Sequence, residues 1–429
     1  MPAPPAAGSF PMSRLNLWLL VALVCVSSSL AFAENWPRFR GPSGVGVSAE
    51  KGLPQTWDGK SGDNVLWKSP IGKKLTGWSS PIVWEDRVFL TCSERPTKEQ
   101  ETAKQNGDHF VVCYQASDGK EVWRTKIEPG KELAGNDTAA APTPVTDGKS
   151  VFAWFGSGVI AAIDFEGKVL WRKERSGPFH LNPGICSSPA EFGENVILLS
   201  DQNRDAGFLQ GLNKKTGDIT WEHKRVKTGA CNASPFVLDV NGKPQLIVSG
   251  ERILQGLRPQ DGEPIWWCKS LAFGASPAYG RGVLFIDKGS NEPAQAVDPT
   301  GAGDVTETHV KWKIERVAGE YSSPVISGNY IYRLQGDGVV SIYSLEDGEK
   351  LSTGRLEGIS KIVSPIVSGD GLVYYITAGT SYVIKPSDSL EIVATNKLGG
   401  HGSNSSSPAI SGGKIFVRDF ENLYCIGKK

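Results

Sequence analysis

Few side chains in this sequence have the types and spacing that catalysis needs. The histidines have no metal-ligand spacing and fall in different parts of the chain, and we interpret each as a surface or turn residue. They are His109, His180, His223, His309 and His401. The sequence contains no HExxH, GxSxG, Walker or GxGxxG motif. These observations argue against the common hydrolases, metalloproteases and nucleotide-binding enzymes.

The cysteines are the next candidates for chemistry. Cys92, Cys113, Cys186, Cys231, Cys268 and Cys425 follow the first 33 residues, and none forms a CxxC pair. A thioredoxin-like or zinc-ribbon site therefore has no support. In an oxidising compartment Cys92 and Cys113 are the first choice for a disulfide, with free buried thiols as the alternative. A second possible disulfide joins Cys186 to Cys231.

The beginning of the chain looks like a secretory leader. Arg14 precedes an apolar run at 15–26, and Ala31-Phe32-Ala33 fits a small-x-small cleavage site. The run is too short to span a bilayer. We therefore predict a signal peptide at 1–33, a mature chain that starts at Glu34, and a secreted or periplasmic protein without a transmembrane segment.

The charges of the chain are balanced, since Lys+Arg and Asp+Glu are both 46. This balance argues against nucleic acid as a partner.

A repeated Ser/Thr-Pro dipeptide organises the rest of the chain. After the first interval, its prolines are separated by 41–47 residues: Pro81, Pro144, Pro189, Pro235, Pro277, Pro324, Pro365 and Pro408. Each proline opens two short apolar runs joined by a polar turn, which is the pattern of a β-hairpin. Proline fits the first residue of a strand because no ladder hydrogen bond is lost there.

The second half of each repeat has its own signature. After a third apolar run, a turn glycine precedes a tryptophan by four residues in four repeats: Gly119 and Trp123, Gly167 and Trp171, Gly217 and Trp221, Gly262 and Trp266. Trp312 ends the fifth repeat without the glycine, and Ser352 and Ala394 take the Trp position in the next two. Four strands per repeat predict a β-propeller of eight blades.

The eighth repeat contains only three strands, the last at 422–426. Asn64 to Ile71 carries Trp67 in the right setting to supply the missing strand. We predict an all-β, eight-bladed propeller at 64–429 that this N-terminal strand closes, with an irregular extension at 34–63. Trp67, Trp123, Trp171, Trp221, Trp266 and Trp312 are predicted to dock between blades as structural residues.

The loop before each Ser/Thr-Pro should lie at one mouth of the central channel. The residues there vary on a repeated frame, as binding residues usually do. The candidate channel-mouth residues are Trp78, Asn182, Cys186, Cys231, Phe273, Tyr321, Lys361, His401 and Asn404, with Asn136, Asp137 and Asn232 beside them. This mixture suits a small polar ligand, a glycan or a peptide. The alternative is a water-filled funnel without a ligand.

The phrases Asp118 to Trp123 (DGKEVW) and Thr216 to Trp221 (TGDITW) resemble the tryptophan-docking repeat of the PQQ-like (pyrroloquinoline quinone) propeller superfamily. The resemblance covers about 64–429 and implies one of two kinds of eight-bladed protein. One kind is the quinone-dependent dehydrogenases, and the other is the BamB-like non-catalytic scaffolds. The opening at 35–42 (NWPRFRGP) also resembles that of secreted bacterial PQQ-like repeat proteins.

The dehydrogenase branch implies a quinone slot, a calcium site, a carboxylate base and a disulfide of adjacent cysteines. No two cysteines are adjacent here, and neither Trp266-Trp267 nor the loop at 298–304 has the ligand alternation of a calcium site. We therefore expect no catalytic, cofactor-binding or metal-binding residues. PQQ and calcium enter only under the alternative of a PQQ-dependent oxidoreductase.

The sequence thus favours a monomeric, non-catalytic binding or assembly scaffold of the cell envelope with a protein partner. Strand addition at an exposed sheet edge is one mode of binding. A third interpretation is a glycan-binding module that uses Trp78, Phe273 and Tyr321 as stacking faces.

Overall fold

The structure of the protein is a computed structural model. It describes residues 1–4, 33–132, 134, 139–175, 185–202, 207–225, 231–271, 274–289, 292–317, 322–359, 365–400 and 406–429. One compact unit spans Ala33–Lys429. The predicted signal peptide lies almost entirely outside the described residues. No helix in the described part of the chain is long and apolar enough to cross a membrane.

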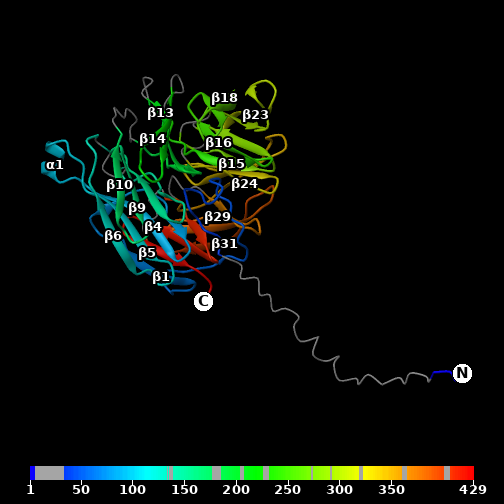
Figure 1. Ribbon diagram of the computed structural model, residues 1–429, viewed down its shortest axis with the longest axis horizontal. Coiled ribbons are helices and arrows are strands. Elements are labelled where there is room, and N and C mark those ends of the chain that lie inside the picture. Colours follow the sequence, from blue (N-terminus) through cyan, green and yellow to red (C-terminus); the bar gives the residue numbers. More distant parts are fainter. Residues whose placement is uncertain are drawn as a thin grey trace. The chain divides into compact units, whose positions relative to one another are not determined.

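Eight small antiparallel sheets follow one another around a ring, and each is one blade (Figure 1). The first four blades consist, from the inner to the outer strand, of the following elements. Blade 1 has β2 (Leu75–Thr76), β3 (Ile82–Trp84), β4 (Arg87–Glu94), β5 (His109–Gln115) and β6 (Glu121–Ile127). Blade 2 has β7 (Val145–Thr146), β8 (Ser150–Trp154), β9 (Val159–Asp164) and β10 (Val169–Glu174). Blade 3 has β11 (Ala190–Phe192), β12 (Asn195–Ser200), β13 (Gly207–Asn213) and β14 (Ile219–Arg225). Blade 4 has β15 (Phe236–Val240), β16 (Lys243–Ser249), β17 (Ile253–Leu257) and β18 (Pro264–Lys269), with β22 (Gly303–Asp304) added outside.

The other four blades repeat the order. Blade 5 has β19 (Ala278–Gly280), β20 (Val283–Asp287), β21 (Glu292–Val297) and β23 (Val310–Val317). Blade 6 has β24 (Val325–Ser327), β25 (Tyr330–Leu334), β26 (Val339–Ser344) and β27 (Lys350–Arg355). Blade 7 has β28 (Ile366–Val367), β29 (Val373–Tyr375), β30 (Thr380–Lys385) and β31 (Glu391–Lys397). Blade 8 has β32 (Ala409–Ser411), β33 (Lys414–Arg418), β34 (Asn422–Ile426) and β1 (Val65–Pro70). The described helix α1 (Lys98–Thr102) lies in the polar insert of blade 1 and buries no residue.

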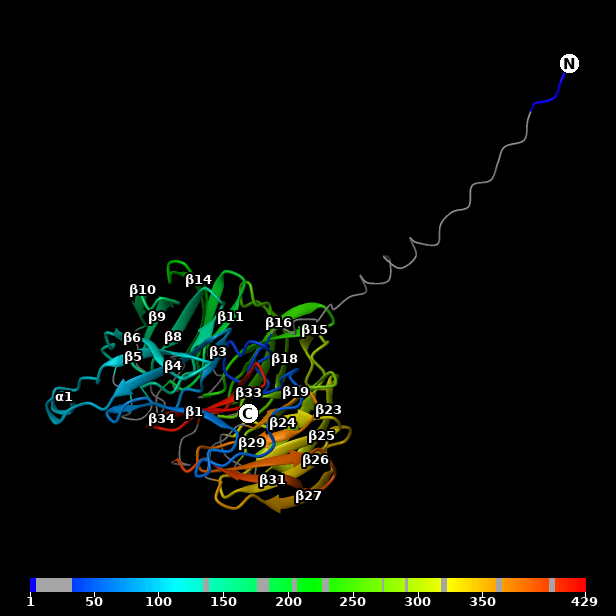
Figure 2. The ribbon, with the colours of Figure 1, turned by 90° about the horizontal axis from the view of Figure 1, so that it is seen from below.

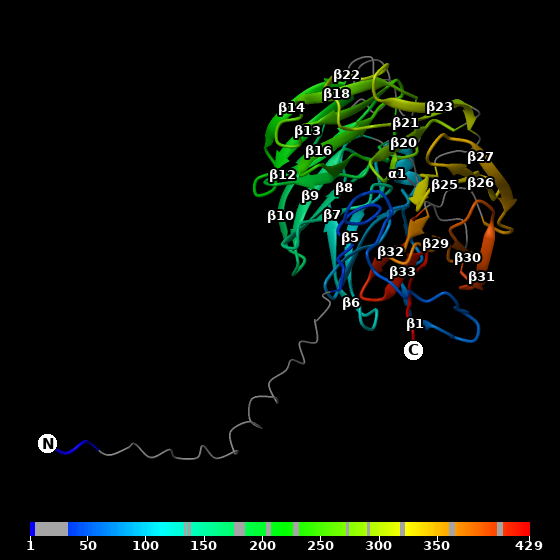
Figure 3. The ribbon, with the colours of Figure 1, turned by 90° about the vertical axis from the view of Figure 1, so that its right-hand side faces the viewer.

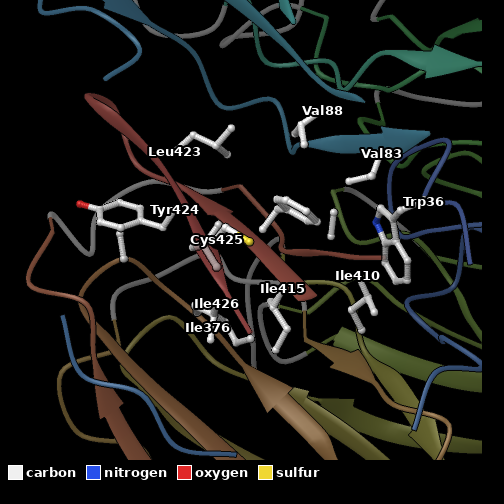
Figure 4. Close-up of a cluster of buried hydrophobic side chains, with 14 of the residues drawn as sticks. Trp36, Val83, Val88, Ile376, Ile410, Ile415, Leu423, Tyr424, Cys425 and Ile426 are labelled. Atoms are coloured by element: carbon white, nitrogen blue, oxygen red, sulfur yellow. The ribbon is translucent and has the colours of Figure 1, made fainter. Parts of the chain in front are cut away.

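The N-terminal strand completes the last blade, as the sequence predicts. β1 pairs antiparallel with β34, and Trp67 lies opposite Cys425. Both strands contribute to the largest apolar cluster, where Trp36 of the extension joins Val83 and Ile410 (Figure 4). The two ends of the chain therefore close the ring together.

The outer-strand tryptophans lie against a turn of the following blade. A buried indole N–H usually has a hydrogen-bond partner, and four of these tryptophans donate it to a backbone oxygen in that turn, whereas Nε1 of Trp221 has none. The pairs are Trp67 with Ala116 (3.1 Å), Trp123 with Phe165 (2.7 Å), Trp171 with Lys214 (2.8 Å) and Trp312 with Leu345 (3.1 Å). Each contact joins one blade to the next.

The turn glycine has two roles in this contact. Gly119 has a φ of 73°, a value that favours glycine. A Cβ there would also lie only 2.6 Å from the ring of Trp67. Gly217 stands in the same relation to Trp171, again at 2.6 Å. The glycine is thus needed for the turn and for the close approach of the preceding blade's indole.

Trp266 reaches the next blade indirectly. Its Nε1 donates to Oε1 of Gln245 at 2.7 Å, and Nε2 of Gln245 donates to the carbonyl of Pro299 at 3.2 Å. Blade 5 has a long turn without the repeat glycine, so the glutamine side chain bridges the gap. At the junction of blades 6 and 7, where Ser352 replaces the tryptophan, Leu390 packs over Gly354 instead.

All six described cysteines are free thiols. The predicted Cys92–Cys113 disulfide is wrong, because Cys92 packs in the cluster with Trp36 while Cys113 packs in a different cluster with Phe89. The two side chains therefore lie on opposite faces of one sheet. The possible Cys186–Cys231 disulfide is also wrong, since both residues are free.

Candidate functional site

Side-chain hydroxyls link inner strands of successive blades near the predicted channel mouth, in an arrangement that we call the hydroxyl ring. In each described link, the backbone N–H of the Ser or Thr before the repeat proline donates to the hydroxyl of its counterpart in the next blade. The described links are Ser80 to Thr143 (2.8 Å), Thr143 to Ser188 (3.0 Å), Ser188 to Ser234 (2.9 Å), Ser234 to Ser276 (3.0 Å), Ser276 to Ser323 (3.0 Å) and Ser407 to Ser80 (2.9 Å). Ser364, through which the other two links would pass, lies outside the described residues.

This ring explains why a hydroxyl residue precedes every repeat proline. Proline has no N–H of its own, so the residue before it supplies the donor while its side chain supplies the acceptor. Sequence reasoning assigned a role to the prolines and missed the hydroxyls. Their occurrence at all eight positions was the available signal.

Residues 34–50 of the N-terminal extension, which we call the plug, lie against the inner strands and the turns that follow them, away from the predicted mouth. Its contacts reach blades 1, 3, 6, 7 and 8. The blue N-terminal part of the compact unit lies beside strands of several blades (Figure 2; Figure 3). Backbone hydrogen bonds join Trp36 to Val83 of blade 1 and Ser48 to Val367 of blade 7, at 2.8 Å and 2.9 Å from N to O. The guanidinium of Arg38 pairs with Glu191 of blade 3 at 2.5 Å. The extension is therefore irregular but firmly held.

Arg40 anchors the plug within the ring. Its side chain is fully buried, and its terminal nitrogens donate to four backbone oxygens. These belong to Ser276 (3.4 Å), Pro277 (3.3 Å), Val45 (2.8 Å) and Pro324 (2.5 Å). Burial lowers the pKa of the guanidinium to about 9, so it remains charged at neutral pH. A buried cation without a carboxylate is costly unless carbonyl dipoles surround it, and here blades 5 and 6 provide them.

Four of the predicted channel-mouth residues lie in the described part of the chain: Trp78, Cys186, Cys231 and Asn232. Trp78 is half-buried and its N–H donates to the carbonyl of Ala140 in blade 2 at 3.1 Å. Cys186 is half-buried beside Asn232, and Cys231 is buried next to Asp201. Outside the described residues lie Asn136, Asp137, Asn182, Phe273, Tyr321, Lys361, His401 and Asn404.

The two cysteines at this mouth are not suited to nucleophilic chemistry. Burial raises the pKa of both Cys186 and Cys231 to about 12. Because the thiolate is the reactive form, a thiol with such a pKa is inert at neutral pH. Cys231 packs in an apolar cluster formed by blades 4 and 5, whereas the backbone N–H of Cys186 donates to the side-chain oxygen of Asn232 at 3.4 Å.

Two fully buried carboxylates form ion pairs with arginines. Asp201 accepts from Nε of Arg225 at 2.7 Å, and Asp287 accepts from NH2 of Arg333 at 2.9 Å, all four side chains being buried. Over the described ranges no three His, Cys, Asp or Glu side chains are grouped as a metal ion requires.

A pocket of about 460 Å³ opens between blades 4 and 5, where β18 ends and β21 begins. Arg252, Lys269 and Lys313 line it, over an apolar floor that includes Leu271 and Ile286. In each blade, the fourth strand ends and the third strand begins on the side where the inner strand starts. The pocket therefore lies on the face of the ring opposite the plug. Its positive lining favours anionic groups over cations.

His109 is buried in blade 1 rather than exposed as the sequence interpretation held. Its ring stacks on Phe155 with centroids 4.6 Å apart, and Nε2 lies 2.8 Å from Oγ of Ser157. Burial lowers its pKa to about 4. The folded protein therefore keeps this imidazole neutral where the unfolded chain, with a pKa near 6.5, takes up a proton.

We expect the free energy of unfolding to fall as the pH drops from about 6.5 to about 4, because only the unfolded state binds a proton there. The shift corresponds to about 3 kcal/mol in total. His109→Gln keeps a partner for Ser157 and should remove most of this dependence, whereas His309→Gln, at a partly exposed site, should not. Urea titrations at pH 7 and pH 4.5 measure the effect. If the free energy of unfolding of His109→Gln fell between these pH values as much as that of the native protein, the prediction would be contradicted.

Comparisons with known proteins agree with this architecture. Residues 107–274 match the family model described as outer membrane protein assembly factor BamB. The crystal structure of BamB from Moraxella catarrhalis has a TM-score of 0.58 at 13% identity, covering 85% of this chain and 97% of that one. The computationally designed Ika8 protein has a TM-score of 0.53 at 10% identity, covering 89% and 99%.

A third solved structure is the quinohemoprotein alcohol dehydrogenase from Comamonas testosteroni. Its TM-score is 0.43 at 10% identity, covering 92% of this chain and 81% of that one. No curated protein matches the sequence. At these identities the solved structures speak for the fold and not for activity, and the third is too distant to support either. The fold and the match at 107–274 together support a propeller of the PQQ-like, BamB-like type.

Proposed function

We propose that this chain, a PQQ-like and BamB-like eight-bladed β-propeller, is a non-catalytic scaffold that binds a protein partner in the cell envelope. The BamB family match at 107–274 and the predicted leader support this proposal. The observation that carries it is the set of open outer strands with exposed apolar side chains on blades 1–3.

Every outer strand carries a β-bulge at the same place, just before the tryptophan position. At this place, two residues of the outer strand that are two positions apart pair with two successive residues of the neighbouring strand. The residue between them therefore has no partner in the pairing. The omitted residues are Leu66, Val122, Leu170, Thr220, Ile265, Lys311, Leu351 and Val393. Most of them are apolar, and Leu66, Ile265 and Leu351 pack against apolar clusters of the core.

The outer strands of blades 1–3 carry exposed apolar side chains at or next to the omitted positions, and Ile392 and Val393 of blade 7 are exposed in the same way. Val122, Val169, Leu170 and Ile219 are between 37% and 47% exposed. They lie on β6, β10 and β14, each of which ends its sheet. An edge strand with exposed apolar residues is a template for pairing with another chain.

The chain itself shows that this kind of edge accepts an extra strand. β22 pairs in parallel with β18 of blade 4, with Trp266 opposite Gly303 and Trp267 opposite Asp304. The next residue, Val305, donates its N–H to the carbonyl of Trp267 at 2.9 Å. The equivalent strands of blades 2 and 3, β10 and β14, end their sheets without such an addition. We infer that the partner contributes an extended, partly apolar segment to one of these two edges.

Site-specific photo-crosslinking in cells of the source organism tests the proposal. A photoreactive residue at Leu170 or Ile219 should give a discrete crosslinked species, because a paired strand would lie within contact of these side chains. Lys350, an exposed residue at the start of the outer strand of blade 6, serves as the matched control. We expect the crosslink at Leu170 to decrease at least several-fold when Ile219→Lys or Val169→Lys is introduced beside it, because a charged edge resists pairing.

Three results would contradict the proposal. They are crosslinks of equal yield at Lys350, no crosslink at either edge, and turnover of a redox dye by the purified protein with added PQQ and calcium. Cell fractionation checks the envelope location separately.

A further inference from the structure

Glu34 is the first residue after the predicted leader. Both its backbone nitrogen and its side-chain carboxylate make hydrogen bonds. Its backbone nitrogen lies 3.1 Å from Oε1 of Glu50. Its own Oε2 accepts from the N–H of Ala49 at 3.0 Å and from the hydroxyl of Ser48. Ala33, one residue earlier, is exposed and begins the compact unit. The tight contacts therefore start at the residue that leader removal would make the first.

The carboxylate of Glu50 is fixed in place by the last blade. Oε1 accepts from the N–H of Gly412 and Oε2 from the N–H of Gly413, each at 2.6 Å. These glycines form the turn between β32 and β33 and both have positive φ. The hydrogen-bond donors around this carboxylate are thus backbone N–H groups of blade 8 and of Glu34.

Hydrolysis of the Ala33–Glu34 bond would change the charge of one of these donors. The peptide C–N bond breaks, water gives its hydroxyl to the carbonyl carbon of Ala33 and a proton to the nitrogen of Glu34. The resulting amine takes a further proton from solvent, because an α-amino group has a pKa of about 7.7–8.0. A neutral amide that donates to Glu50 thereby becomes an ammonium beside a carboxylate, which is a stronger bond.

We propose that Glu50 is the binding site for the α-ammonium group that leader cleavage creates at Glu34, so that processing fastens the plug to blade 8. This inference rests on the predicted cleavage after Ala33. The plug then has two charged anchors, the new ammonium at blade 8 and Arg40 between blades 5 and 6. A chain that keeps even one leader residue lacks the first anchor, since its terminal ammonium is displaced by about 3.8 Å.

Two purified chains test this, one that begins at Glu34 and one that retains Ala33. Each is treated at pH 7.5 with a limiting amine-acylating reagent, and mass spectrometry measures the modification of the N-terminal peptide. The Glu34 chain should react several-fold more slowly, because only the neutral amine reacts and pairing favours the ammonium. Each unit by which pairing raises the pKa lowers the neutral fraction roughly tenfold.

The same pair of chains with Glu50→Gln provides the matched control. This substitution also weakens the contacts to the turn at Gly412, so the comparison is always between the two N-termini in one background. With Glu50→Gln the two chains should react at similar rates. A second readout is the melting temperature, where the advantage of the Glu34 chain should be present below pH 7 and disappear as the pH rises through the pKa of its ammonium.

Equal acylation of the two chains with Glu50 intact would overturn the proposal, as would a difference that survives Glu50→Gln. If Glu50→Gln does not fold, the acylation ratio and the pH dependence of the two chains that retain Glu50 still decide it. N-terminal sequencing of the exported protein tests the leader independently. A different cleavage site there would refute the leader prediction, whereas the result with the purified chains concerns the Glu50 site alone.

Discussion

Deletion of residues 64–71 is expected to lower the melting temperature of the protein by about 10 °C or more. The deletion removes β1, which pairs with β34, and with it the contact of Trp67 with the turn of blade 1 at Ala116 and Gly119. Loss of a fully buried tryptophan costs about 3–5 kcal/mol, and the half-buried Trp67 together with the strand pairing of β1 is expected to reach this range. About 1 kcal/mol moves the melting temperature of a large domain by roughly 2–4 °C. The open ring also leaves β34 as a bare edge.

A deletion of the same length elsewhere serves as the control. Residues 97–104 include α1, which buries no side chain, and their removal should shift the melt by no more than about 2 °C. Differential scanning calorimetry of the three proteins gives the comparison. Similar melting temperatures for the two deletions would mean that β1 does not hold the ring closed.

The second large effect is expected at Arg40. Arg40→Met should lower the free energy of unfolding by about 3 kcal/mol or more, because four carbonyl oxygens from the plug and from blades 5 and 6 lose their donor in a buried place. Arg40→Lys should rescue little of this, since an ammonium cannot reproduce the planar fork of donors.

Urea unfolding and limited proteolysis measure this prediction. In Arg40→Met the bonds within residues 34–63 should become accessible to protease at concentrations that leave the native protein intact. Arg355→Met, at a side chain about half exposed on blade 6, should stay within about 0.5 kcal/mol of the native protein. A protected extension in Arg40→Met would show that the plug is held without its buried cation.

The repeat could be predicted from the sequence because the residues that recur in it are determined by local backbone geometry. A proline at the start of an inner strand and a glycine in a tight turn are dictated by their own backbone geometry. These marks persisted in blades 6 and 7, where Ser352 and Ala394 replace the tryptophan, so the number of blades could be predicted there too. The closure by β1 followed from counting strands in the last repeat.

The parts that could not be predicted depend on contacts between distant residues. Arg40 lies 284 positions from Pro324, whose carbonyl it reaches, and nothing in the segment around Arg40 indicates that partner. The cysteine pairing failed because the alternation of a strand places Cys92 and Cys113 on opposite faces, which depends on the register between β4 and β5. His109 begins a strand, and its burial depends on Phe155 of the next blade.

The hydroxyl ring has a direction. In every described link the N–H belongs to one blade and the hydroxyl to the blade that follows, and the link from Ser407 to Ser80 keeps the same sense. In such a head-to-tail series, each blade donates to the next and accepts from the one before. Every donor and acceptor has a partner only when the last blade is linked to the first. A piece made of half the blades would therefore carry a free donor on one flank and a free acceptor on the other, and two identical pieces could complete a full circle with twofold symmetry.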